Sequence, residues 1–188
     1  AAMRRARELD PQNAMSHALS SQVAFQARDY QAALDHASQA IALDQDLWIG
    51  YAMRGQALEQ SGQSQLALDA LAIAARFSSD NSKPVAIRGY ILARAGRHDE
   101  ARAVLAMLTA QSRTRYVPPY ALALVHAGLG EHDAVFEWLD RAFDVHDVHL
   151  IYLPVDPKWD PYRSDPRFGA VLMRCGFAGA FRTPAGGK

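Results

Sequence analysis

The amino-acid sequence predicts an all-α fold in which antiparallel helix pairs follow one another along the chain. The first observation is a repeat period, seen most plainly in Gly62, Gly96 and Gly130, each 34 residues from the next. The second is that apolar residues within each period recur every three or four residues, as in a helix, and do not alternate as in a strand. The third is that each of these glycines divides two such apolar stretches, where it suits a helix–helix turn.

The predicted elements follow this pattern in chain order. Each period, 14–47, 48–81, 82–115 and 116–147, is expected to hold two helices joined at the turn. The expected helix pairs are 14–27 with 30–43, 48–61 with 64–77, 83–95 with 98–110, and 118–129 with 132–145.

Residues 1–13 are expected to be the second helix of an incomplete leading repeat. Leu9 and Asp10 precede Leu43 and Asp44 by the same 34 residues. A second helix without its first leaves an apolar face uncovered. We therefore expect the chain to be the C-terminal part of a longer array; a purpose-built N-terminal capping helix is the rival interpretation.

Two further columns of the repeat hold small residues. The column in the first helices is Ser21, Gly55, Gly89 and Ala123, and the column in the second helices includes Ala33, Ala67 and Ala101. Small side chains allow two antiparallel helices to approach closely. The columns therefore predict that the two helices of each pair touch at these positions.

Together, these features resemble the tetratricopeptide repeat. The resemblance rests on the 34-residue two-helix period, the small columns, Tyr51 in an aromatic position and "ELDP" before a new repeat. It covers roughly residues 14–147 and is weakest in the fourth period, where Pro118 and Pro119 begin the first helix and Val135 replaces a small residue. It implies a right-handed superhelix, an α-solenoid, with a concave face lined by the first helix of each pair.

Proteins resembling this family usually bind an extended peptide or a partner helix on the concave face. The candidate peptide- or partner-binding residues here are Gln22, Phe25, Gln26, Gln56, Glu59, Gln60, Tyr90, Arg94 and Tyr120. Amides, aromatic rings and an arginine suit hydrogen bonding along a peptide backbone and apolar anchoring. A solvated polar groove without a ligand is equally compatible with them. The Lys and Asn clamp for carboxylate tails, found in one subclass, has no matching residues.

Residues 148–177 are predicted to form a Pro-rich C-terminal cap that contains a short helix at about 166–175. Asp156, Asp160 and Asp165 each precede Pro, a pairing typical of the start of a helix or turn. We expect Trp159 and Tyr162 to cover the open apolar end of the array. The segment also resembles the ends of bacterial repeat arrays that are attached to signalling domains. Residues 178–188 are expected to be disordered.

The sequence offers little that could carry catalysis. It contains no phosphate-binding glycine loop and no nucleophile elbow. Cys175 is expected in the core. His146 and His149 could share a metal ion but lack a regularly spaced third and fourth ligand. We therefore expect no enzyme, no cofactor and no metal, with a metal enzyme as the least favoured alternative.

Charge and hydropathy limit the partners. The chain has 188 residues with 20 basic and 20 acidic side chains, so no overall field attracts nucleic acid or an acidic membrane. No apolar run is long enough to span a bilayer and no signal peptide is present, which favours a cytoplasmic location. The favoured function is a non-catalytic interaction or sensory scaffold in a larger bacterial regulatory protein. Its partner would be a protein, a peptide or a domain of the parent chain. The alternative is homo-oligomerisation through the unpaired N-terminal helix.

Overall fold

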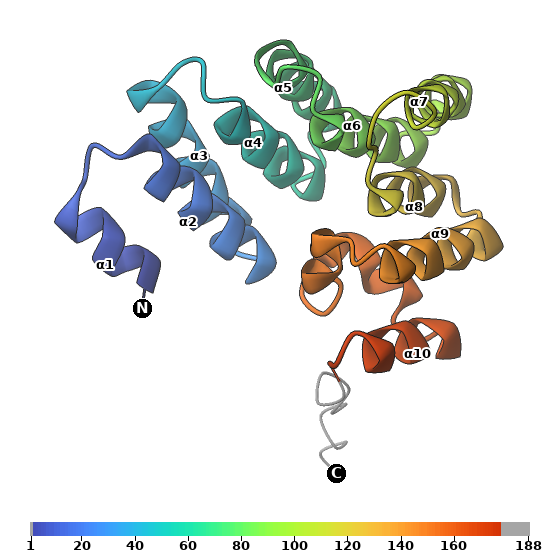
Figure 1. Ribbon diagram of the computed structural model, residues 1–188. Coiled ribbons are helices and arrows are strands. Elements are labelled where there is room, and N and C mark those ends of the chain that lie inside the picture. The colour runs from blue at the N-terminus through green and yellow to red at the C-terminus, as the bar shows by residue number, and fades with distance from the viewer. Residues whose placement is uncertain (1, 178–188) are drawn as a thin grey trace.

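The computed structural model describes residues 2–177, which form helices and no strand (Figure 1). The α-helices are α1 (Ala2–Leu9), α2 (Ala14–Gln26), α3 (Tyr30–Leu43), α4 (Trp48–Gln60), α5 (Ser64–Phe77), α6 (Ser82–Arg94), α7 (His98–Gln111), α8 (Pro119–Leu129), α9 (His132–Asp144) and α10 (Pro166–Arg174). The 3-10 helices are η1 (Val148–Tyr152) and η2 (Pro157–Tyr162). The predicted disorder of 178–188 lies outside the described residues.

The helices pack in sequential pairs, α2 with α3, α4 with α5, α6 with α7 and α8 with α9. The prediction of an all-α fold with sequential helix pairs is therefore confirmed. The boundaries expected for the eight paired helices all lie within one residue of the observed ones, whereas the leading helix expected within 1–13 is the shorter α1. None of the helices in residues 2–177 is long and apolar enough to cross a membrane.

The backbone conformation at the turn between paired helices favours glycine. Gly62, Gly96 and Gly130 have φ angles of 76°, 77° and 73°, in the left-handed region that glycine adopts readily. In the first pair the equivalent position is Arg28, with a φ of 63°. A residue with a side chain loses about 1–2 kcal/mol in this conformation. Arg28 is therefore the exception in its column, and its contacts below give the reason.

The small columns mark close approaches between helices. A Cβ atom added to Gly55 would lie 2.8 Å from Leu71 Cγ, in the partner helix of the same pair. One added to Gly89 would lie 2.9 Å from both Val104 and Val125. Val104 lies in α7, the partner helix of the same pair, and Val125 lies in α8, the first helix of the next pair. Gly89 of α6 is therefore in close contact with both helices. The predicted helix contacts at these positions are confirmed.

The C-terminal segment, residues 148–177, follows a different path from the predicted one. The helix pairs form an arc, and η1 and η2 lie on its inner side, which α2, α4, α6 and α8 line (Figure 1). Trp159 packs against Tyr120 of α8 and Tyr162 against Phe136 of α9, so the last pair is covered as expected. The segment also crosses the arc to the first two pairs, which the sequence did not predict. Asp160 is ion-paired to Arg28, beside the first pair.

Two of the three Asp–Pro pairs start helices as predicted. Asp156 accepts a hydrogen bond from the Lys158 backbone N–H at the start of η2. Asp165 accepts one from the Arg167 backbone N–H at the start of α10. Asp160 instead lies inside η2, and its carboxylate binds arginines. The predicted helix at 166–175 is α10, which packs on α9.

Candidate functional site

The structure places the predicted partner-binding residues on α2, α4, α6 and α8, but in unequal surroundings. Four are buried: Phe25, Gln56, Tyr90 and Tyr120. Four are half-buried: Gln22, Gln26, Glu59 and Gln60. Arg94 is exposed. Much of the predicted surface is therefore covered, and the cover is the C-terminal segment.

Lys158 in η2 contacts two helices of the inner side. Its Nζ donates a hydrogen bond to Gln56 Oε1 at 2.6 Å and lies 4.7 Å from the ring centre of Phe25. The residue is only 3% exposed, and its charge is balanced by Asp156 Oδ2 at 2.8 Å. A buried ammonium is tolerated when it is paired and hydrogen-bonded in this way. Lys158 thus fixes η2 against α2 and α4.

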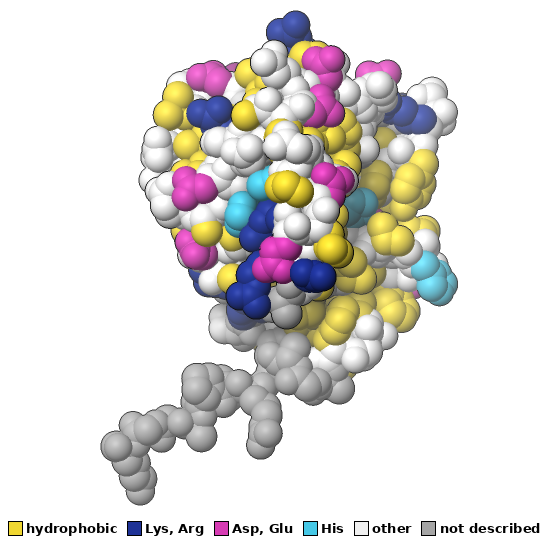
Figure 2. All heavy atoms as spheres, turned by 90° about the vertical axis from the view of Figure 1, so that its left-hand side faces the viewer, with side chains coloured by type: hydrophobic (Ala, Val, Ile, Leu, Met, Phe, Trp, Pro, Cys, Tyr) yellow, Lys and Arg dark blue, Asp and Glu magenta, His cyan; other side chains and the backbone are white. Residues whose placement is uncertain are grey.

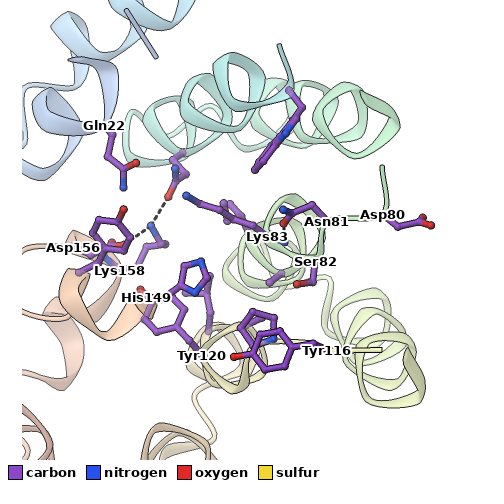
Figure 3. Close-up of a pocket in the computed structure, with 18 of the residues that line it drawn as sticks. Gln22, Asp80, Asn81, Ser82, Lys83, Tyr116, Tyr120, His149, Asp156 and Lys158 are labelled. Atoms are coloured by element: carbon purple, nitrogen blue, oxygen red, sulfur yellow. Dashed lines mark hydrogen bonds and ion pairs between the residues drawn. The ribbon is translucent and has the colours of Figure 1, made fainter. Parts of the chain in front are cut away.

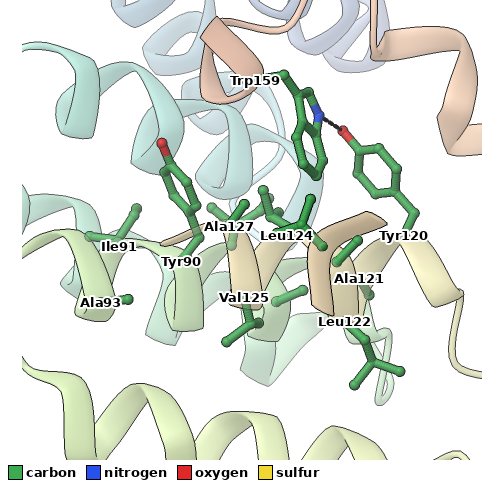
Figure 4. Packing of buried hydrophobic residues seen from close by; sticks show 14 of the residues in the cluster. Tyr90, Ile91, Ala93, Tyr120, Ala121, Leu122, Leu124, Val125, Ala127 and Trp159 are labelled. Atoms are coloured by element: carbon green, nitrogen blue, oxygen red, sulfur yellow. Dashed lines mark hydrogen bonds between the residues drawn. The ribbon is translucent and has the colours of Figure 1, made fainter. Parts of the chain in front are cut away.

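Trp159 provides the apolar anchor of the same segment. It is fully buried, and its Nε1 donates a hydrogen bond to the Tyr120 hydroxyl at 2.8 Å (Figure 4). Its ring also stacks on Phe168 of α10. Burial raises the pKa of Tyr120 well above its usual value, so the hydroxyl stays protonated and neutral. The contact joins η2, α8 and α10.

Asp147 holds Tyr120 and His149 in place at one end of the site. Asp147 accepts hydrogen bonds from the Tyr120 backbone N–H at 3.0 Å and pairs with His149 Nδ1 at 2.7 Å. Burial opposes ionisation of Asp147, but the hydrogen bonds from His149 and from the backbone N–H groups of His149 and Tyr120 hold its pKa below the usual value. His149 in turn stacks on the Tyr120 ring. This network links η1 to the start of α8.

A cavity of about 390 Å³ lies between the C-terminal segment and the inner side (Figure 3). The start of α6 contributes Asn81, Ser82 and Lys83, and the C-terminal segment contributes the side chains of His149, Tyr152, Asp156 and Lys158. Of the nine predicted residues, three line it: Gln22, Gln56 and Tyr120. The cavity is within the size range of small-molecule sites, roughly 300–1,000 Å³.

Lys83 extends from α6 into this cavity (Figure 3). Its nearest aromatic contact is the Tyr152 ring, whose centre is 5.8 Å from Nζ. Burial lowers the pKa of Lys83 to about 8, the charge of Lys158 acts in the same direction, and Asp156 opposes both. At neutral pH the side chain is therefore charged but poorly solvated.

Sequence reasoning missed Lys83 and Lys158, although a signal was present. The sequence contains only three lysines, Lys83, Lys158 and Lys188, and all its other basic residues are arginine. Two of the three line one cavity. The scarcity of lysine could have singled these positions out, but only the fold brings them together.

The remaining candidates for chemistry are dispersed. His149 is paired with Asp147, whereas His146 lies in a turn with a φ of 55°. Within residues 2–177, no three His, Cys, Asp or Glu side chains are grouped so that they could hold a metal ion. Cys175 is half-buried against the core, and burial raises the pKa of its thiol.

Comparison with protein-family models gives no match, and comparison with curated proteins gives no significant match.

Proposed function

We propose that the chain is a non-catalytic interaction module of the tetratricopeptide type, which binds a protein or peptide partner along the inner side of its helix pairs. In this proposal the module belongs to a larger bacterial regulatory protein. The observation that carries the proposal is that the inner side already holds a segment of the same chain from outside the helix pairs, residues 155–160. Within residues 155–160, Lys158 contacts α2 and α4, Trp159 contacts α8, and Asp160 binds Arg28 in the turn between α2 and α3.

These contacts have the character of a peptide-binding surface. A fully buried tryptophan that also finds a hydrogen-bond partner is typical of the residues that dominate binding energy at interfaces. A lysine over an aromatic ring adds a cation–π contact worth about 0.5–2 kcal/mol. The inner side therefore combines aromatic anchoring with amide hydrogen bonding, as a partner segment would need.

The inner side also retains surface that the C-terminal segment leaves accessible. Gln26, Glu59 and Gln60 are half-buried, and Arg94 is exposed. Gln60 donates to Glu59 Oε2 at 2.6 Å and accepts from the Tyr30 hydroxyl at 3.2 Å. In our proposal a partner binds along this strip, beside the C-terminal segment.

Peptide selection against the purified chain tests the proposal. Selected peptides would be measured by fluorescence anisotropy against the wild type and against Gln26→Ala, Gln60→Ala and Arg94→Ala. We expect each variant to weaken binding about 3–30-fold, as loss of about 1–2 kcal/mol of contact implies.

The matched controls are Gln39→Ala and Arg76→Ala, which replace exposed residues of α3 and α5. They should leave affinity unchanged. Equal effects of inner-side and control substitutions would contradict the proposal.

Self-association through the N-terminal helix is the second candidate, and one observation favours it. Helix α1 buries none of its residues, and Leu9 is 69% exposed. Leu19 and Val23 on α2 are also exposed. At this end of the molecule the hydrophobic side chains are interspersed with charged ones (Figure 2). Light scattering over a wide concentration range would detect a dimer, which Val23→Asp should dissociate; a concentration-independent monomer would exclude it.

A further inference from the structure

The cavity between α6, α8 and the C-terminal segment carries a positive charge without a counter-charge. Lys158 is paired with Asp156 at 2.8 Å, and Arg115 lies 3.7 Å from Asp80. Across the described part of the chain, Lys83 Nζ has neither a hydrogen-bond nor an ion-pair partner. A charged group that is removed from water is stabilised when an opposite charge joins it.

Helix α6 adds to the positive potential in the same place. Asn81 is its N-cap residue, and Asn81, Ser82 and Lys83 all line the cavity. The first turn of a helix carries roughly half a positive elementary charge. The N-terminus of α6 and the Lys83 ammonium thus both face the cavity, and together they favour the binding of an anion there.

The rest of the lining is largely apolar and aromatic. Trp48, Ile87 and Leu124 line the cavity from α4, α6 and α8. Tyr152 of η1 and Tyr116, which precedes α8, add two rings. Such walls fit a flat apolar body, and the polar groups of the lining would fix its orientation.

The path of the C-terminal segment limits the size of the ligand. Asp156 and Lys158 form part of the cavity wall, and Lys158 is held to Gln56 across the inner side. An extended peptide could not run through the cavity while the segment is bound. The occupant that fits is therefore a free small molecule.

We propose that this cavity binds a small organic anion, a carboxylate on a flat apolar body, with the carboxylate at Lys83. The apolar body lies against Ile87 and Leu124. The site is independent of the proposed partner surface, because Gln26, Gln60 and Arg94 do not line the cavity. The ligand would also contact Asp156 and Lys158, so its binding would stabilise the folded-back position of the C-terminal segment.

Isothermal titration calorimetry with 2-naphthoate, and with 2-naphthamide as the neutral analogue of the same shape, tests the site. We expect 2-naphthoate to bind one to one and 2-naphthamide to bind at least tenfold more weakly. Lys83→Met should weaken 2-naphthoate binding at least tenfold. Arg54→Met is the matched control, because it removes an equal charge from an exposed position of α4 outside the cavity.

Circular dichroism and thermal melting establish that the variants are folded. If Lys83→Met does not fold, Lys83→Gln provides the same comparison with a polar side chain. No binding of 2-naphthoate, equal binding of the two probes, or equal effects of the Lys83 and Arg54 substitutions would each overturn the proposal. A preference for the carboxylate that is lost only with Lys83 supports it.

Discussion

Arg28 Nη2 contacts both carboxylate oxygens of Asp160, at 2.7 and 2.9 Å, although the two residues are 132 positions apart in the chain. Nη1 of the same guanidinium donates to the Val155 carbonyl oxygen at 3.1 Å. Arg28 occupies the turn position at which the other three pairs have glycine. The unfavourable backbone conformation is thus combined with a side chain that attaches the first helix pair to the C-terminal segment.

Arg28→Gly should separate these two effects. Glycine relieves the turn by about 1–2 kcal/mol, while the partly exposed ion pair is worth at most about 1 kcal/mol. We therefore expect little loss of global stability but faster hydrogen exchange at residues 155–160. Native-state exchange measured by mass spectrometry would report this local opening.

Asp160→Asn provides the check on that interpretation. It should speed exchange in the wild type and have a smaller effect in the Arg28→Gly background, where only the Asp160–Arg163 ion pair is left to lose. Additive effects would show that Arg28 acts independently of Asp160.

Trp159→Ala should lower the free energy of unfolding by about 3–5 kcal/mol, because it empties a fully buried aromatic site. Tyr120→Phe should cost less, about 1–3 kcal/mol, because it leaves Trp159 Nε1 buried without its acceptor. Urea unfolding would measure both. Trp138→Ala, at a half-buried position of α9, is the control and should cost less than Trp159→Ala.

The pKa of Lys83 predicts a pH dependence of stability. Burial lowers this pKa from 10.5 to about 8, so between these values the unfolded chain binds more protons than the folded one. The contribution of Lys83 to the free energy of unfolding should therefore rise with pH, by up to about 1.4 kcal/mol per unit. Lys83→Met should abolish this rise and stabilise the chain relative to the wild type below pH 8.

Urea unfolding at intervals from pH 7 to 9.5 would test this. The range stops there because burial raises the pKa of Tyr90, and a raised tyrosine pKa lowers stability at higher pH. A difference between wild type and Lys83→Met that stays constant across the range would refute the prediction.

Three glycines allow steric and backbone effects to be compared. Gly55→Ala should destabilise by roughly 1–3 kcal/mol, because its Cβ would lie 2.8 Å from Leu71 Cγ. Gly62→Ala meets no atom within 4 Å but has a φ of 76°, so it should cost about 1–2 kcal/mol through the backbone. Gly169→Ala, in α10 with open space, should stabilise by up to about 1 kcal/mol. Thermal melting of the three variants gives the comparison.

The sequence predicted the helices well because their causes are local. Apolar spacing and turn glycines act within one period, and they located every paired helix to within one residue. The path of the C-terminal segment depends on contacts such as Lys158 with Gln56, 102 positions apart, which no period encodes. The arginine at position 28 and the rarity of lysine were the two signals in the sequence, because Arg28 interrupts the glycine column and Lys158 is one of three lysines.

The candidate site was only partly predictable for the same reason. The repeat placed Gln22, Gln56 and Tyr120 on the inner side, where all three line the cavity. Lys83 was overlooked because charge at the start of a helix is common on a solvated surface. Lys83 becomes part of a site because the C-terminal segment places the Tyr152 ring and the Lys158 charge near its ammonium.

A row of helix pairs normally has two free ends, and each can fray without disturbing the other. The Arg28–Asp160 and Lys158–Gln56 contacts join the beginning of this row to its end. Local unfolding at either end must then break these contacts with the other end, so that the two ends unfold cooperatively. Local unfolding of the C-terminal segment is therefore coupled to the stability of the first helix pairs.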